Sequence, residues 1–237
     1  MHAADMEIVQ TQHTSRHEYT VVFLHGRDSC AIDFEIEFLA SQASDDRTLP
    51  EIFPQIKWVF PTAKILPAAR FNIAMSQWFD MWSTQDPYER QNEQQEELNN
   101  TVSAILQIIQ DEAAIVGGPQ NIILGGISQG CASAIHALLR QEARLAGFIG
   151  LSSWLPVKET ITTTTMGTAS ETPVFLAHCG DDDVIAVRYG EELRDVLAGT
   201  GMEVEWCQYG DGGHWVNEPQ GIDDIARFMD RVLSATE

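Results

Sequence analysis

The sequence has few basic residues and no long apolar run. Its 14 lysines and arginines are outnumbered by 35 aspartates and glutamates, which gives a formal net charge of −21. A surface of this sign repels the phosphates of nucleic acids and anionic lipid headgroups, so we expect neither as a partner. No stretch approaches the roughly 18 uninterrupted apolar residues that a membrane-spanning helix needs, so we predict no membrane span.

The sequence also lacks closely spaced cysteines and a recognisable targeting segment. Its four cysteines form no C-x-x-C pair, which argues against a structural metal site and predicts reduced, mostly buried thiols. The first 20 residues contain no apolar core of signal-peptide length. We therefore expect a cytoplasmic protein.

Apolar runs alternate with amphipathic segments along most of the chain. At 237 residues and 44% hydrophobic content, the sequence fits a single α/β domain over residues 1–237. Strands are predicted at 19–24, 56–60, 121–124, 148–151, 174–177 and 204–208, and helices at 32–41, 128–141, 189–197 and 221–233, with another ending near Val116. Because the strands read as continuous apolar runs, we predict a mostly parallel sheet with helices on both faces.

Three segments depart from this alternation. Residues 1–18 are predicted to be poorly ordered or to form an edge strand. Residues 62–90 are irregular and aromatic-rich, and we interpret residues 62–95 as a lid or substrate-binding region, because long irregular segments in compact domains are usually functional. The Thr-rich stretch 160–165 is predicted to be a surface loop.

The most informative motif is G-x-S-x-G at residues 126–130. This spacing is found where a strand turns sharply into a helix and exposes a serine hydroxyl, here that of Ser128. A serine is a weak nucleophile until an imidazole accepts its proton, and that imidazole needs a carboxylate to fix its tautomer.

Later strand ends supply both groups. His214 lies in a Gly-rich loop after the strand 204–208, and Asp181, Asp182 and Asp183 follow the strand 174–177. The order Ser, Asp, His is the one that α/β-hydrolases use. Backbone N–H groups of Arg27 and Gln129 are the expected oxyanion donors.

Less specific interpretations of these residues stay open. Ser128 could be a plain helix N-cap, and the loop around His214 could be a solvated turn. His25, which ends the first predicted strand, is expected to position the oxyanion loop rather than to react.

Several motifs together resemble the acyl-protein thioesterase family, also called the phospholipase/carboxylesterase family of α/β-hydrolases. VVFLHG, SQWFD, GGISQG and SSWLP occur in that family's order, and the resemblance runs over about residues 19–233. The family's acid motif, H-G-x-x-D-x-x-V-P, aligns with His178 and selects Asp182, with Asp183 as the fallback. The sequence departs from the family pattern at Cys179, at Ile185-Ala186 and at Arg27-Asp28-Ser29, the last of which stands where the family usually has L-G-D.

The resemblance implies an α/β-hydrolase fold and hydrolysis of esters or thioesters through an acyl-enzyme, without metal or cofactor. The substrates it implies are acylated proteins or small, lipid-like esters. It also implies an apolar acyl channel, for which the candidate lining residues are Leu66, Ile73, Met75, Trp78, Phe79, Trp82, Trp154 and Leu155, together with Ile65, Phe71 and Met81. Aromatic residues in a long loop often pack as a satellite core instead.

We therefore predict a serine esterase or thioesterase with Ser128 as nucleophile, His214 as base and Asp182 as orienting acid. An esterase for a small or secondary-metabolite ester is the alternative within the same fold, and a non-catalytic binding module is the alternative from another class. Whether the protein forms a homodimer stays open.

Overall fold

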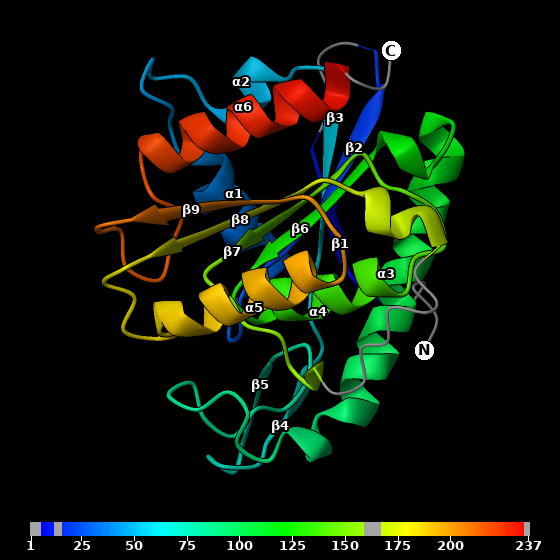
Figure 1. Cartoon of the computed structure of the whole chain (residues 1–237). Helices are drawn as coiled ribbons and strands as arrows, with labels where there is room; N and C mark the ends of the chain where they lie inside the picture. The colour runs from blue at the N-terminus through cyan, green and yellow to red at the C-terminus, as the bar shows by residue number, and fades with distance from the viewer. Residues whose placement is uncertain (1–5, 12–15, 159–166, 235–237) are drawn as a thin grey trace.

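A seven-stranded sheet with strand order β1-β3-β2-β6-β7-β8-β9 crosses the centre of the molecule (Figure 1). The structure, a computed structural model, describes residues 6–11, 16–158 and 167–234. The strands are β1 (Ile8–Gln10), β2 (Tyr19–Leu24), β3 (Ile56–Pro61), β6 (Ile122–Ile127), β7 (Gly147–Leu151), β8 (Val174–Cys179) and β9 (Val204–Tyr209). Neighbouring strands are parallel except β1, which pairs antiparallel with β3. The predicted mostly parallel α/β fold is confirmed.

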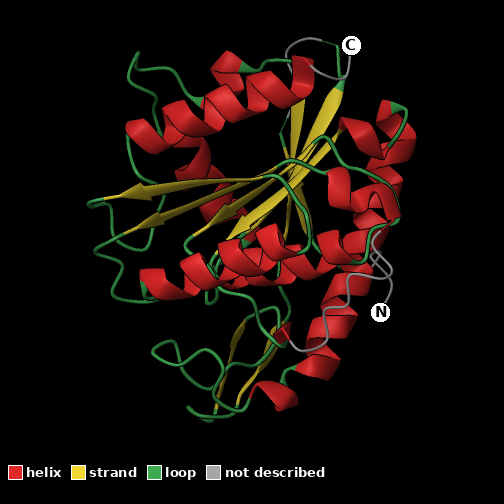
Figure 2. Cartoon of the chain, viewed as in Figure 1, coloured by secondary structure: helices red, strands yellow, loops and turns green. Residues whose placement is uncertain are grey.

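Helices cover both faces of this sheet (Figure 2). The helices α1 (Ala31–Ala40) and α6 (Gln220–Ser234) lie on one face, and α3 (Gln95–Val116), α4 (Gln129–Leu139) and α5 (Val187–Gly199) on the other (Figure 1). Each layer has its own apolar cluster: Phe34, Phe38 and Phe228 pack on the first face, and Val102, Ile105 and Ile135 on the second. Burial of apolar surface on both faces therefore stabilises the packing of the helices against the sheet.

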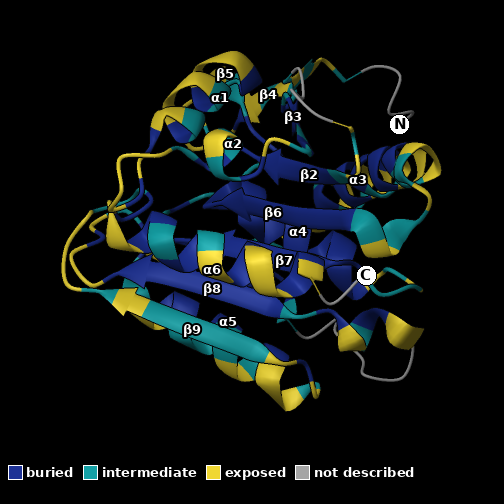
Figure 3. Ribbon diagram, turned by 90° about the horizontal axis from the view of Figure 1, so that it is seen from above, coloured by how far each residue is buried: buried dark blue, intermediate teal, exposed yellow. Residues whose placement is uncertain are grey.

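The central strands are buried along nearly their whole length, whereas the edge strand β9 is only half-buried (Figure 3). The side chains of the central strands face helices on both sides of the sheet, so each position in these strands favours an apolar residue. This explains why the strands can be recognised in the sequence. The predicted ends differ from the observed ones by at most three residues.

The segment between β3 and α3 is the main difference from the prediction. Residues 65–76 are not irregular: β4 (Ile65–Ala68) and β5 (Ile73–Ser76) form an antiparallel hairpin that projects from the body of the molecule (Figure 1). Polar and apolar residues alternate little along the hairpin, so its strands could not be predicted from the hydrophobic pattern of the sequence. A short helix, α2 (Leu49–Ile52), was also missed, although Thr48 and Glu51 form a capping box around its first turn.

The N-terminal region contributes the edge strand β1. The predicted Thr-rich loop at 160–165 lies outside the described residues. Within the described part of the chain, no helix is long and apolar enough to cross a membrane.

Candidate active site

Ser128 sits in the turn between the central strand β6 and helix α4. Its φ of 55° and ψ of −125° lie outside the regions that most residues adopt, and this backbone conformation is typical of a strand-to-helix turn that exposes a serine. Two hydrogen bonds fix the turn: the Ser128 N–H donates to the Leu151 carbonyl at 2.9 Å, and the Ser153 hydroxyl donates to the Ser128 carbonyl at 2.7 Å.

The glycines of the motif permit close approach of the backbone around Ser128. A Cβ atom at Gly130 would lie 2.4 Å from the carbonyl oxygens of both Leu24 and His25, and one at Gly126 would lie 2.7 Å from the Cys131 nitrogen. Real Cβ atoms do not approach backbone so closely. Helix α4 can therefore begin directly against the end of strand β2.

His214 and Asp182 meet at the carboxyl ends of the neighbouring strands β8 and β9. The Nδ1 atom of His214 lies 2.7 Å from Oδ2 of Asp182. The other carboxylate oxygen, Oδ1, accepts the N–H groups of Val184 and Ile185, each at 2.9 Å. With Nδ1 engaged, Nε2 is the ring nitrogen of His214 that remains for a second partner.

Neither of the other two aspartates of the run takes this place. Asp181 accepts the N–H of Gly213 at 2.9 Å, on the same loop as His214, and Asp183 is exposed. The structure therefore joins His214 to Asp182 alone among the three.

A second histidine, which pattern analysis did not assign to the site, also contacts Asp182. His178 is fully buried, and its Nε2 lies 3.1 Å from Oδ2 of Asp182 and 2.8 Å from the Ile185 carbonyl. Burial disfavours ionisation of Asp182, but hydrogen bonds from His178, His214 and the Ile185 backbone outweigh it and hold the pKa of this carboxyl well below its ordinary value. Asp182 is therefore a carboxylate at neutral pH.

The two predicted oxyanion donors lie close to Ser128. Gln129 provides the first N–H of α4, which has no partner inside the helix. Arg27 follows Gly26, whose position lies so close to the nucleophile that an added Cβ would be 3.6 Å from the Ser128 Cβ. The next residue, Asp28, donates its N–H to the Ser76 carbonyl at 2.7 Å, whereas the Arg27 N–H has no acceptor among the described residues.

The segment 76–79 holds both donors in place through side chains. The Gln129 amide accepts the Trp78 N–H at 2.9 Å and donates to the Phe79 carbonyl at 2.8 Å. The Trp78 indole donates to the His25 carbonyl at 2.8 Å, and the Arg27 guanidinium donates to the Gln77 side chain at 2.8 Å. The oxyanion loop and the start of α4 are therefore fixed to the same short stretch.

His25 is buried beneath this loop. Its Nδ1 lies 2.7 Å from the Gly26 carbonyl, and its Nε2 accepts the Ala63 N–H at 3.0 Å. Burial lowers the pKa of His25, although the bond to Gly26 opposes the change. These contacts are consistent with a positioning role.

A cavity of about 350 Å³ opens beside Ser128 and His214. Its apolar wall comes from α1, the hairpin strand β5, the segment after the hairpin, the end of β6 and the loops after β8 and β9. It consists of Phe34, Met75, Met81, Ile127, Val184, Ile185 and Trp215. Charged side chains also line it, namely Arg27, Asp28 and Glu37.

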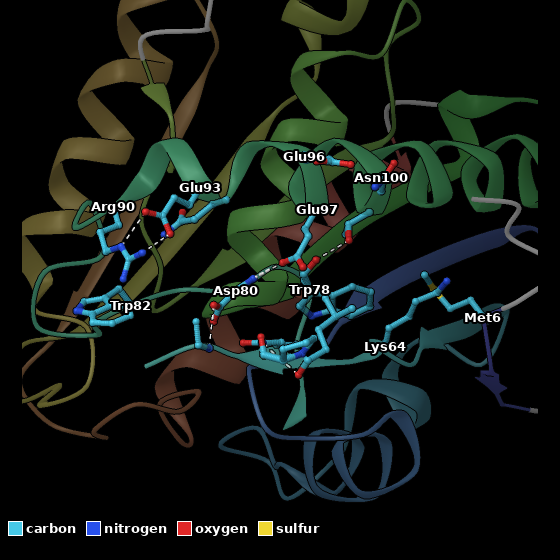
Figure 4. A pocket seen from close by; sticks show the side chains of 16 residues that line it. Met6, Lys64, Trp78, Asp80, Trp82, Arg90, Glu93, Glu96, Glu97 and Asn100 are labelled. Atoms are coloured by element: carbon cyan, nitrogen blue, oxygen red, sulfur yellow. Dashed lines mark hydrogen bonds and ion pairs between the residues drawn. The ribbon is translucent and has the colours of Figure 1, made fainter. Parts of the chain in front are cut away.

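Among the predicted channel residues, Met75 and Met81 line this cavity. Phe79, Trp154 and Leu155 are fully buried in the core, and Ile65, Phe71 and Ile73 are exposed on the hairpin. Leu66, Trp78 and Trp82 line a different pocket (Figure 4). Trp78 and Phe79 are buried in the same apolar cluster as residues of α3 and α4, so their side chains are not available to the cavity.

Comparison with known proteins identifies the family. A phospholipase/carboxylesterase family model matches residues 4–233. The chain belongs to the phospholipase/carboxylesterase family. It is therefore a member of a family of hydrolases that act on esters and thioesters.

Among individual relatives of this phospholipase/carboxylesterase family member, acyl-protein thioesterase 1 of Yarrowia lipolytica is 32% identical over 92% of this chain and 93% of its own. The structure is similar to that of Zea mays acyl-protein thioesterase 2, with a TM-score of 0.78, 22% identity and coverage of 96% of this chain and 99% of that one. It is also similar to the esterase PE8, with a TM-score of 0.77, 22% identity and the same coverage.

Several residues at the site of this family member could not be predicted from the sequence. Phe34, Glu37 and Trp215 line the cavity from α1 and from the loop after His214. Trp215 was detectable in principle, because it directly follows His214. Phe34 lies within the helix predicted at 32–41, and no local signal shows that an apolar residue of such a helix also borders a cavity.

The described residues contain no group of three or more His, Cys, Asp or Glu side chains that could hold a metal ion. The four cysteines are free thiols, with Cys131 and Cys179 buried and Cys30 and Cys207 half-buried.

Proposed function

We propose that this phospholipase/carboxylesterase family member is a serine hydrolase that cleaves thioesters or carboxylic esters of acylated proteins or lipid-like molecules. The 2.7 Å bond between His214 and Asp182, at a cavity that Ser128 also lines, carries the proposal. The similarity to acyl-protein thioesterase 1 of Yarrowia lipolytica supports the substrate class.

In the acylation step, Ser128 Oγ attacks the carbonyl carbon and transfers its proton to Nε2 of His214. The carbonyl electron pair moves to the oxygen, and the N–H groups of Arg27 and Gln129 stabilise the resulting oxyanion. When the oxyanion collapses, the C–S or C–O bond breaks, and His214 returns the proton to the departing thiolate or alkoxide. The acyl group is then esterified to Ser128.

In the deacylation step, a water molecule takes the place of the serine. His214 removes a proton from the water as it attacks the acyl carbon, which forms a second oxyanion. When this oxyanion collapses, the bond between the acyl carbon and Ser128 Oγ breaks, and His214 returns the proton to Ser128 Oγ, which leaves a carboxylic acid and the free enzyme. Asp182 keeps the proton of His214 on Nδ1 throughout and stabilises the imidazolium that forms in both steps.

A small ester is the second candidate substrate. It is favoured by the charged side chains of Arg27, Asp28 and Glu37 around the cavity and by the burial of Phe79 and Trp154 in the core. A cavity walled partly by charge accommodates a long acyl chain less well than a fully apolar channel does.

The test is hydrolysis of p-nitrophenyl esters and acyl thioesters of increasing chain length by the wild type, by Ser128→Ala and by Ser103→Ala, an exposed serine on α3 that serves as control. We expect Ser128→Ala to lose about a thousandfold or more in kcat. An optimum at long chains supports the lipid-like substrates, and an optimum at short chains supports the small ester. Activity that survives in Ser128→Ala would refute the proposed nucleophile.

Labelling by a fluorophosphonate probe tests for an activated serine independently of the acyl group. The wild type and Ser103→Ala should label and Ser128→Ala should not. A wild type that neither labels nor hydrolyses any ester would instead indicate a binding module.

A further inference from the structure

The imidazole of His178 is buried beside the pair formed by His214 and Asp182. It belongs to β8, and its Nε2 lies 3.1 Å from Oδ2 of Asp182 and 2.8 Å from the Ile185 carbonyl oxygen. A carboxylate and a carbonyl can only accept hydrogen bonds. Nε2 of His178 therefore carries a hydrogen and shares it between these two acceptors.

Helix α5 and strand β9 pack on this ring and fix its orientation. A Cβ atom added at Gly190 of α5 would lie 2.4 Å from Nδ1 of His178, so only a glycine lets the helix come this close. The centre of the Trp206 ring, on β9, lies 6.4 Å from that of the imidazole. Nδ1 has no hydrogen-bond partner among the described residues, so a hydrogen placed there would find no acceptor. The ring is held with Nε2 toward Asp182.

The two oxygens of Asp182 are held by different kinds of group. Oδ1 accepts backbone N–H groups of its own loop, those of Val184 and Ile185. Within the described part of the chain, Oδ2 is held only by two side chains, those of His178 and His214. Apart from His214 itself, His178 is therefore the contact that fixes the oxygen to which His214 binds.

The same two imidazoles share the charge of Asp182. No lysine or arginine of the described residues forms an ion pair with this carboxylate. The other acids of the two loops supply no positive charge: Asp181, Asp183 and Asp211. A hydrogen bond to the ionised form makes a carboxylate less basic. A carboxylate that also binds His178 therefore stabilises the imidazolium of His214 less strongly than one that binds His214 alone.

We propose that His178 is a positioning residue of the active site, which holds Oδ2 of Asp182 against His214 and, by sharing the charge of this carboxylate, extends activity to lower pH. The inference rests on the proposed function, because it requires His214 to act as the base. His178 does not line the cavity beside Ser128, so its effect passes through Asp182.

The test is the pH dependence of kcat/KM for a p-nitrophenyl ester that the wild type cleaves, at a temperature where every protein is folded. His178→Leu removes the donor at similar volume, and His178→Gln keeps an N–H near the position of Nε2. The matched control is His136→Leu, which replaces another buried histidine, one whose Nε2 lies 2.7 Å from the Pro156 carbonyl oxygen. The charged groups that border the cavity with His214 stay the same in every variant: Arg27, Asp28 and Glu37.

In His178→Leu, we expect the acid limb of kcat/KM to move to higher pH by about half a unit to one unit, because a carboxylate with one donor fewer stabilises the imidazolium more strongly. We expect kcat at the pH optimum to fall about tenfold, because Oδ2 loses one of its two fixed contacts. His178→Gln should restore most of both values, and His136→Leu should keep those of the wild type.

An unchanged acid limb in His178→Leu would show that His178 only packs in the core, and this would overturn the proposal. An equal displacement in His136→Leu would indicate general loosening of the fold and would overturn it as well. Both results require an active wild type and leave the proposed function intact. A wild type that hydrolyses no ester would instead refute the proposed function, and this inference with it.

A measurement on the wild type alone decides the case in which the variants at position 178 do not fold. In protein labelled with ¹⁵N-histidine, the imidazole of His178 is the one whose protons show a nuclear Overhauser effect to the Trp206 ring. Its nitrogen shifts should show the hydrogen on Nε2 throughout the pH range in which activity appears. A hydrogen on Nδ1 in that range would overturn the proposal.

Discussion

The side chain of Gln129 connects the proposed oxyanion hole to the segment that carries the hairpin, and its replacement tests this connection. Methionine has a similar volume but can neither accept the Trp78 N–H nor donate to the Phe79 carbonyl. The substitution keeps the backbone N–H at position 129. Any loss of activity would therefore come from displacement of the donors and not from removal of one.

The magnitude follows from the two groups that lose their partners. Gln129 is fully buried, so each backbone group left unpaired costs about 1–3 kcal/mol, or about 2–6 kcal/mol together. At about 2–4 °C per kcal/mol for a chain of this size, Tm should fall by about 10 °C. Loss of a whole oxyanion donor costs about a hundred- to a thousandfold in kcat, so misplacement should cost about ten- to a hundredfold.

Thermal unfolding and steady-state hydrolysis of a p-nitrophenyl ester, both measured on the same preparations, would check these values. The control is Gln107→Met, at an exposed position on α3, which should change neither quantity by more than a small amount. A Gln129→Met protein with wild-type kcat at a temperature where it is fully folded would refute the argument that these bonds position the oxyanion donors.

Two further predictions concern other side chains. In Asp182→Asn, the backbone N–H groups that bind one carboxylate oxygen would keep the amide oxygen in that place, so the amide NH₂ would face His214 and force its proton onto Nε2, the wrong ring nitrogen. We expect kcat to fall about a thousandfold or more in Asp182→Asn and to stay nearly normal in the control Asp183→Asn. Retention of activity in Asp182→Asn would assign the acid role to another residue. Burial lowers the pKa of His136 from 6.5 to about 4, against the opposing bond to the Pro156 carbonyl, so the unfolded chain binds a proton first as the pH falls. The contribution of His136 to stability is thus fully present above about pH 6.5 and is lost toward pH 4. Between pH 7 and pH 5, the free energy of unfolding measured in urea should fall by about 2 kcal/mol less in His136→Gln than in the wild type. An equal fall in both proteins would contradict a neutral buried imidazole.

Much of the fold could be predicted because its determinants are local. The strands β2, β6 and β8 are apolar at nearly every position, since helices cover both of their faces, and this pattern is visible without any tertiary information. Ser128 could also be predicted from local sequence, because its turn requires glycines at fixed positions beside it. The order of Ser128, Asp182 and His214 along the chain follows from the order of the strand ends on which they lie.

Tertiary structure decided what depends on contacts between distant segments. Strand order alone left three adjacent aspartates open, and the resemblance to the family's acid motif selected Asp182. The contact between His214 and Asp182 itself comes from the packing of the loops after β8 and β9. The aromatic residues of the 62–95 region look alike in sequence, yet Phe79 is in the core and Phe71 is exposed on the hairpin. The sequence shows which side chains are apolar and which are charged. Which neighbour it meets, and whether that neighbour is core, cavity or solvent, is set by the arrangement of elements far apart in the chain.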